Sequence, residues 1–269
     1  MKLGINTYTY MWAIGFEGAR PEQPLTALGL LEKARQLGVG LVQSGPNLPL
    51  DQLSEPELAT FEAQARSTGI ELEVGTRGLE MEHLLGQIVL CRRLGSKLLR
   101  TIPEIGGQTP PSEEIVHHLR LLQPELDRQG VRLGLENGRI PAADLADLLR
   151  ELDSPVFGVV LDMVNSLAVP EGWKEVTRLL APYTMCLHFK DFAIRRLWHG
   201  MGFLCEGRPA GQGQIDAGWL FETLRPSPHD FNVILELWTP EQETLAETVA
   251  LEQDWAVESI SYLRNFVKG

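Results

Sequence analysis

The feature that most constrains the fold is a regular alternation of short β-rich runs with longer amphipathic helical runs along all 269 residues. The β-rich runs recur at a mean spacing of about 33 residues, close to the length of one strand–helix unit. Eight strands are expected to begin near Lys2, Val39, Ile70, Lys97, Val131, Phe157, Thr184 and Phe231. Helices are expected near 25–37, 55–67, 80–94, 112–129, 142–152, 172–181, 216–225 and 240–264.

Eight strands, each followed by a helix, predict an α/β fold of the (β/α)8 TIM barrel type, with one domain over residues 1–269. The strand count also permits a doubly wound open sheet. The long stretch 189–215 is expected to be irregular. Because loops of this length in compact domains usually serve function, we predict that it closes over an active site.

The charge and cysteine content exclude several classes of protein. The net charge of −12 disfavours nucleic acid as a partner, because an acidic surface repels phosphates. The three cysteines form no CxxC pair, which argues against a disulfide framework or zinc knuckle and fits reduced thiols in the cytoplasm. Neither a signal peptide nor a membrane-spanning segment is expected.

Four ionisable residues recur at the same position of successive predicted strands: Glu136, Asp162, His188 and Glu236. The first three are each 26 residues apart, and the last step is longer because it contains 189–215. Side chains alternate along a strand, so all four are predicted to point into the barrel at its C-terminal mouth. The same alternation places these inside: Gly134, Val160, Cys186 and Ile234. It places these outside, under the helices: Leu133, Leu135, Val159, Leu161, Met185, Leu187, Val233 and Leu235.

Three carboxylates and one imidazole form a hard, mostly oxygen ligand set. Such a set predicts one divalent metal ion, Mn²⁺, Mg²⁺, Co²⁺ or Zn²⁺. Without a cation, carboxylates this close would repel and raise one another's pKa.

The four strand ends resemble motifs of the xylose isomerase-like superfamily. They read LGLEN at 133–137, VVLD at 159–162, CLHFKD at 186–191 and VILELW at 233–238. The superfamily includes ketose 3-epimerases, hydroxypyruvate isomerases, 3-dehydroshikimate dehydratases and endonuclease IV. The resemblance implies that all four residues bind one metal ion, and that Glu136 and Glu236 also act as acid and base on opposite faces of the substrate.

Two departures from the family pattern bear on function. Epimerase-like relatives often carry His three residues after the Asp, where this chain has Asn165, an amide that cannot shuttle a proton. Endonuclease IV-like relatives need further His ligands on the third and fourth strands. Those strands end here in VGTR at 74–77 and RTIP at 100–103, which argues against a nuclease.

Several residues near the predicted mouth are candidates for binding a small carbohydrate or sugar acid. Basic residues after the seventh strand, on an acidic protein, favour an anionic substrate, although a solvated loop face would look the same. Glu73 is expected to face the barrel interior and to pair there with Arg100 or Arg132. The substrate-binding candidates are Tyr8, Trp12, Arg100, Asn165, Lys190, Asp191, Arg195 and Trp238.

The leading prediction is a metal-dependent isomerase or epimerase that removes a proton next to a carbonyl and passes through an enediolate. The alternative is a lyase on the same scaffold, a decarboxylase or dehydratase of a 3-oxo sugar acid, which the basic loop and Asn165 favour. A non-catalytic barrel is a third possibility, disfavoured by the complete ligand set. A homodimer or homotetramer is expected.

Overall fold

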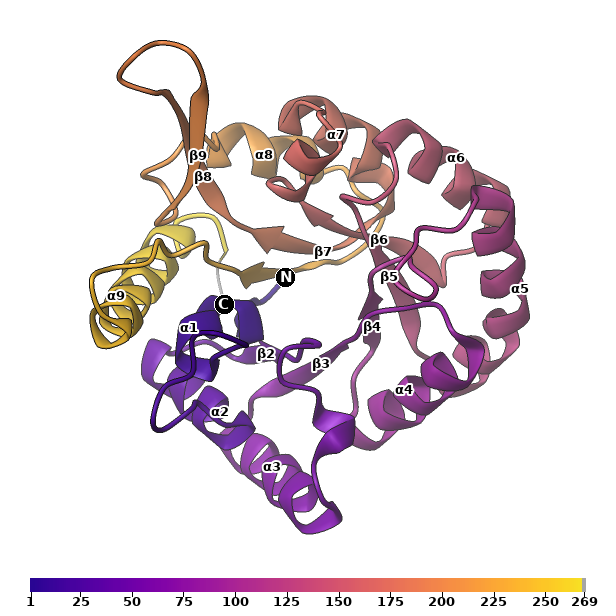
Figure 1. Cartoon of the computed structure of the whole chain (residues 1–269). Coiled ribbons are helices and arrows are strands. Elements are labelled where there is room, and N and C mark those ends of the chain that lie inside the picture. The colour runs from indigo at the N-terminus through magenta and orange to yellow at the C-terminus, as the bar shows by residue number, and fades with distance from the viewer. Residues whose placement is uncertain (268–269) are drawn as a thin grey trace.

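The computed structural model describes residues 1–267 and shows a closed barrel of parallel strands surrounded by helices (Figure 1). Around the barrel the strands follow the order β1-β10-β7-β6-β5-β4-β3-β2, and β1 pairs with both β2 and β10. This closure confirms the (β/α)8 prediction and excludes the open sheet. The barrel strands are β1 (Leu3–Asn6), β2 (Leu41–Gln43), β3 (Glu71–Gly75), β4 (Leu98–Thr101), β5 (Arg132–Glu136), β6 (Phe157–Asp162), β7 (Thr184–Phe189) and β10 (Asn232–Leu235).

The helices lie close to their predicted positions, because local capping chemistry sets their ends. Gly38 and Gly69 end their helices at φ 65° and 70°, the left-handed region that glycine adopts without a Cβ penalty. The last helix begins five residues later than predicted, since Thr244 and Glu247 form a capping box at its start. The long helices are α2 (Ala27–Leu37), α3 (Glu55–Thr68), α4 (Met81–Leu94), α5 (Ser112–Gln129), α6 (Ala142–Leu152), α7 (Trp173–Leu180), α8 (Ala217–Leu224) and α9 (Leu245–Leu263).

A short helix, α1 (Met11–Ile14), follows β1 and was not predicted. Within residues 1–267, no helix combines the length and the apolar character needed to cross a bilayer. The predicted single domain over 1–269 includes residues 268 and 269, which lie outside the described part of the chain.

The apolar core has two layers. The larger layer lies between strands and helices and contains seven of the eight predicted outward residues. The smaller layer contains the barrel-interior residues Leu41, Leu98, Val160, Met185, Cys186 and Ile234. The outward prediction for Met185 is therefore wrong. The β6–β7 register shifts between Val159 and Val160, so simple alternation fails there, and the side chain packs beside Gly158.

The predicted ion pair of Glu73 with Arg100 or Arg132 is also wrong, although the side chain faces the barrel interior as expected. Its carboxylate accepts hydrogen bonds from Gln43 Nε2 at 2.9 Å and from Asn232 Nδ2 at 2.8 Å. Arg100 pairs with Glu136 instead. Burial raises the pKa of Glu73, and two neutral amide donors satisfy a carboxyl group there without a second buried charge.

The stretch 189–215 is not irregular as expected. It contains an antiparallel hairpin, β8 (Asp191–Arg196) and β9 (Phe203–Arg208), which projects outward from the barrel (Figure 1). Its turn carries Trp198, whose surface is 95% exposed. Asp191 fixes the returning chain by accepting backbone hydrogen bonds from Gly211, Gly213 and Ile215.

Candidate metal centre

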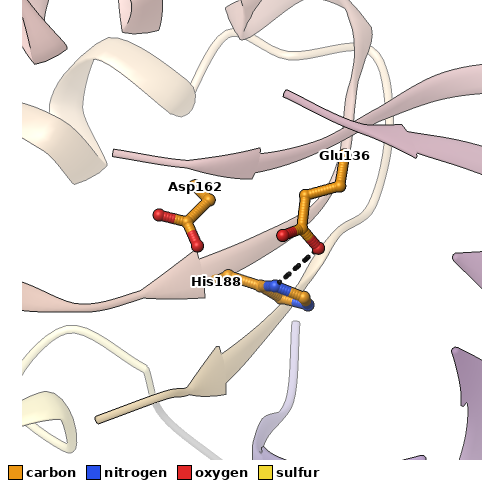
Figure 2. A group of neighbouring side chains, drawn as sticks. All are labelled: Glu136, Asp162 and His188. Carbon is orange, nitrogen blue, oxygen red and sulfur yellow. Dashed lines mark ion pairs between the residues drawn. The ribbon is translucent and has the colours of Figure 1, made fainter. Parts of the chain in front are cut away.

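The parallel register of the barrel brings the predicted ligands together at the C-terminal ends of the strands. Asp162 pairs directly with His188, and Glu136 pairs with Val160, two residues before Asp162. One ligand atom from each of Glu136, Asp162 and His188 lies within 4.8 Å of the others (Figure 2). Glu236 follows β10, and its Oε1 lies 3.0 Å from His188 Nδ1.

Two buried atoms at this centre have no hydrogen-bond partner among residues 1–267: Asp162 Oδ2 and His188 Nδ1. The other Asp162 oxygen, Oδ1, already accepts backbone N–H groups from Val164 at 2.9 Å and Asn165 at 3.0 Å. The close contacts of the two unpartnered atoms are ionic: Lys190 Nζ lies 2.6 Å from Asp162 Oδ2, and oxygens of Glu236 and Glu136 lie 3.0 and 3.3 Å from His188 Nδ1. A carboxylate oxygen and an imidazole nitrogen that face other carboxylates are ligand atoms that a divalent cation could bind. The donor set therefore fits the predicted ion.

Gln43 orients the imidazole from across the barrel. Its Nε2 donates to Glu73, which leaves its Oε1 facing His188 Nε2 at 2.7 Å. The Nε2–H of His188 then donates to this oxygen, and Nδ1 faces Glu236 and Glu136. Burial opposes the charge of the imidazole, but these two carboxylates outweigh it and raise its pKa, so Nδ1 carries a proton that a bound cation would replace. A contact such as that with Gln43 fixes the tautomer of a ligating histidine.

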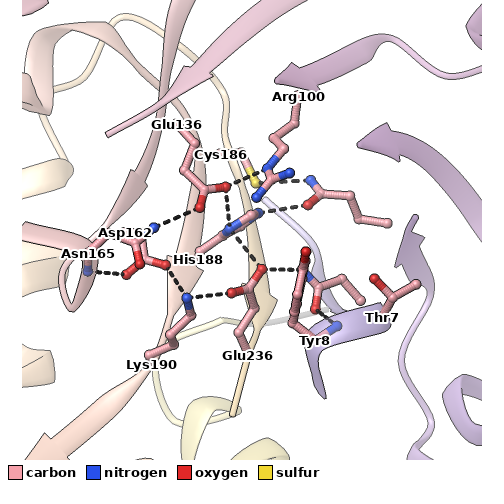
Figure 3. Close-up of polar contacts among 12 residues, drawn as sticks. Thr7, Tyr8, Arg100, Glu136, Asp162, Asn165, Cys186, His188, Lys190 and Glu236 are labelled. Carbon is pink, nitrogen blue, oxygen red and sulfur yellow. Dashed lines mark hydrogen bonds and ion pairs between the residues drawn. The ribbon is translucent and has the colours of Figure 1, made fainter. Parts of the chain in front are cut away.

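Two buried cations lie among the carboxylates (Figure 3). Arg100 forms an ion pair with Glu136, and Lys190 Nζ lies 2.6 Å from Asp162 Oδ2 and 2.7 Å from Glu236 Oε2. Two amides complete the network: Asn165 Nδ2 donates to Glu136 Oε1 at 2.7 Å, and Asn6 Nδ2 donates to Glu236.

These charges set the protonation of the acidic groups. Burial raises the pKa of Glu136, but Arg100 and His188 outweigh it and lower this pKa to about 2. Burial likewise opposes the ionisation of Glu236, but Lys190 and His188 hold its pKa well below its usual value. For Asp162 burial prevails over Lys190, and the pKa is raised.

A pocket of about 360 Å³ opens above this centre. Glu136 and Glu236 line it. So do five of the predicted substrate contacts: Tyr8, Arg100, Asn165, Lys190 and Trp238. A larger cavity of about 590 Å³ surrounds Glu73 and Arg132 and contains none of the four predicted ligands. The smaller pocket is therefore the candidate active site.

Three predicted substrate contacts do not line this pocket. Asp191 holds the chain after β9, Arg195 pairs with Glu206 on the hairpin at 3.0 Å, and the Trp12 indole donates to Thr239 O at 2.9 Å. Because their polar groups have these partners, we leave them out of the proposed substrate contacts.

Sequence reasoning missed other polar groups of the pocket and its wall. Arg77 and Arg139 line the pocket, and Glu104 lies between them. All three stand in the loops that follow β3, β4 and β5, so a search of those loops for charged residues would have found them. Asn6 and Gln43, at the ends of β1 and β2, had no such signal.

The sequence matches the family described as "Xylose isomerase-like TIM barrel" over residues 31–266. The chain belongs to this family. A curated relative, the 3-oxo-isoapionate decarboxylase of Pectobacterium atrosepticum, is 33% identical over 98% of this chain and 95% of its own length.

Solved structures share the xylose isomerase-like fold at low sequence identity. The D-psicose 3-epimerase of Clostridium cellulolyticum H10, with D-tagatose, superposes with a TM-score of 0.73 at 17% identity over 99% of both chains. A xylose isomerase-like TIM barrel protein from Mycobacterium smegmatis, in complex with magnesium, superposes with a TM-score of 0.70 at 14% identity over 97% of both chains.

Proposed function

We propose that this protein is a divalent-metal-dependent decarboxylase of a 3-oxo sugar acid, one of the two lyase reactions that the sequence left open. The 33% identity to a 3-oxo-isoapionate decarboxylase over nearly the whole chain supports this reaction. We propose Glu136, Asp162, His188 and Glu236 as ligands of one ion, with Mn²⁺ as the first to test.

The observation that carries the proposal is the charge of the pocket wall. The net charge of the chain is −12, yet four cationic side chains line this pocket beside two carboxylates. The cationic side chains are Arg77, Arg100, Arg139 and Lys190. Arg100 and Lys190 have carboxylate partners, but the other two arginines share a single carboxylate, so one positive charge is left over. A sugar acid can neutralise that charge, whereas a neutral ketose cannot.

Decarboxylation suits these residues because it starts without removing a proton from carbon. The carbon–carbon bond to the carboxylate breaks, its electron pair is delocalised into the neighbouring carbonyl, and CO₂ leaves. A bound divalent cation would supply Lewis-acid stabilisation of the negative charge on the carbonyl oxygen. The carbon that lost CO₂ then takes one proton, and Lys190 Nζ and the Tyr8 hydroxyl are donors in the pocket wall.

The predicted epimerase or isomerase remains the second candidate, because Glu136 and Glu236 both face the pocket as a two-base mechanism requires. Ion pairs with Arg100 and Lys190 engage both carboxylates, which favours a reaction that needs no strong base. A decarboxylase needs only one proton delivery.

The test is a substrate panel with chelator-treated and Mn²⁺-loaded protein in D₂O. We expect CO₂ release from 3-oxo-isoapionate, with one deuteron on the carbon that lost CO₂, and no activity after chelation. D-psicose, D-tagatose and D-fructose should show neither epimerisation nor α-deuteration. Metal-dependent conversion of these ketoses without CO₂ release from the oxo-acid would establish the epimerase instead.

The cytoplasmic location and the homodimer or homotetramer remain predictions. Cell fractionation tests the first, and light scattering of the purified protein tests the second.

A further inference from the structure

The rim of the pocket carries two guanidinium groups on either side of one buried carboxylate. Arg77 follows β3, Glu104 follows β4 and Arg139 follows β5, three neighbouring strands of the barrel. Arg77 Nε lies 3.4 Å from Glu104 Oε1, and Arg139 Nη2 lies 3.3 Å from Glu104 Oε2. The Glu104 side chain is 7% exposed, against 48% for Arg77 and 43% for Arg139.

The charges of this group do not balance. One carboxylate faces two permanent cations, so the group has a net charge of +1. Both contacts are longer than a good charged hydrogen bond, and Glu104 Oε2 has no hydrogen-bond partner within residues 1–267. Each guanidinium carries five N–H donors, so both retain donors for a ligand.

The inner cations of the pocket have carboxylate partners already. Arg100 is paired with Glu136, and Lys190 lies between Asp162 and Glu236. The surplus positive charge is therefore at the outer rim, at Arg77 and Arg139. A substrate whose carbonyl end faces the metal ligands would place an anionic end against this rim.

We propose that Arg77 and Arg139 form the carboxylate-binding subsite of this protein and determine its preference for sugar acids over neutral sugars. This inference rests on the proposed function, because the ligand is the acid end of the same substrate. Glu104 is a positioning residue that separates the two guanidinium groups. Since both remain nearly half exposed, they replace water around the carboxylate and orient it, without the strong desolvated ion pair that would oppose loss of CO₂.

Binding of substrate analogues tests the subsite without turnover. D-Erythronate is a sugar acid without an oxo group, erythritol is its neutral counterpart, and D-erythrose 4-phosphate carries the other common anion. Isothermal titration of the Mn²⁺-loaded protein should show tighter binding of erythronate than of erythritol. Arg77→Gln and Arg139→Gln should each weaken erythronate binding by about tenfold to about a hundredfold and leave erythritol binding unchanged.

Arg128→Gln is the matched control, because it removes one exposed arginine on α5 and should leave every affinity unchanged. Circular dichroism and melting temperature verify that each variant is folded. The subsite is refuted if the wild-type protein binds erythronate no more tightly than erythritol, or if both arginine variants bind erythronate as tightly as the wild type does. It is also refuted if the variants lose as much affinity for erythritol as for erythronate. Arginine-dependent binding of the phosphate ester alone would overturn the carboxylate assignment.

The two proposals fail separately. If the protein releases no CO₂ from oxo-acids but erythronate binding depends on Arg77 and Arg139, the decarboxylase proposal falls and the subsite stands. If CO₂ is released and both variants keep the wild-type KM, the subsite falls and the decarboxylase stands.

Discussion

Arg100→Met tests whether the buried ion pair between Arg100 and Glu136, in the wall of the pocket, stabilises the fold as its geometry indicates. The Arg100 and Glu136 side chains are 4% and 3% exposed, and Arg100 Nη1 also donates to Thr76 O at 3.0 Å. Removing one partner of a buried pair leaves the other charge uncompensated, at a cost of about 3–5 kcal/mol. Two contacts to Glu136 remain, from Asn165 at 2.7 Å and His188 at 3.3 Å, so we expect the lower half of this range.

The assay is urea unfolding followed by circular dichroism, in chelator, so that no bound cation compensates Glu136. Arg100→Met should lose about 3 kcal/mol of unfolding free energy, and the Arg100→Met/Glu136→Gln double variant should lose much less than the sum of its single variants. Arg128→Met, which breaks an exposed pair with Glu125, should change stability by about 0.5 kcal/mol or less. A loss below about 1 kcal/mol for Arg100→Met, with additive double-variant effects, would refute the reasoning.

Two further predictions concern the metal ligands and the anchoring of α1. In Asp162→Asn the amide oxygen must accept the two backbone N–H groups now bound to Oδ1, so the NH₂ group replaces Oδ2, the oxygen that faces Lys190. Mn²⁺ affinity measured by titration should therefore fall about tenfold or more, whereas the exposed Asp144→Asn should retain it. Burial raises the pKa of Glu252 to about 7, and it outweighs the opposite effect of two backbone N–H groups of α1 that donate to the carboxyl group. The folded state therefore keeps a proton up to about pH 7, whereas the unfolded state releases it near pH 4.3. Unfolding free energy should therefore fall by about 3 kcal/mol as pH rises from 4.5 to 8, and Glu252→Gln should flatten that part of the profile; an unchanged slope in the variant would exclude Glu252 as its source.

The barrel and the convergence of the four proposed ligands follow from local rules. Residues close together in the sequence determine the helix caps, the period of the apolar residues and the recurrence of strand–helix units. A barrel built from such units brings equivalent strand positions to the same end of the barrel. Asp162 and His188 are therefore paired in the structure as their sequence spacing implies.

The missed hairpin also had a local signal. Apolar residues stand at every second position on both strands of the hairpin: Phe192 and Ile194 on β8, and Phe203 and Cys205 on β9. The turn between the strands contains two glycines. A strand is usually recognised because one of its faces is buried and therefore apolar at every second position. The hairpin covers no core, so its alternation is weak evidence for a strand.

Only the tertiary structure decided the partners of the charged groups. Gln43 orients His188 from 145 residues away, and Glu73 is satisfied by Asn232 from 159 residues away. The rim group of Arg77, Glu104 and Arg139 exists because three loops follow neighbouring strands. A sequence pattern states which side of its own strand a residue faces. Hydrogen bonds and ion pairs depend on positions within a few ångströms across different strands, and only the closed barrel sets those distances.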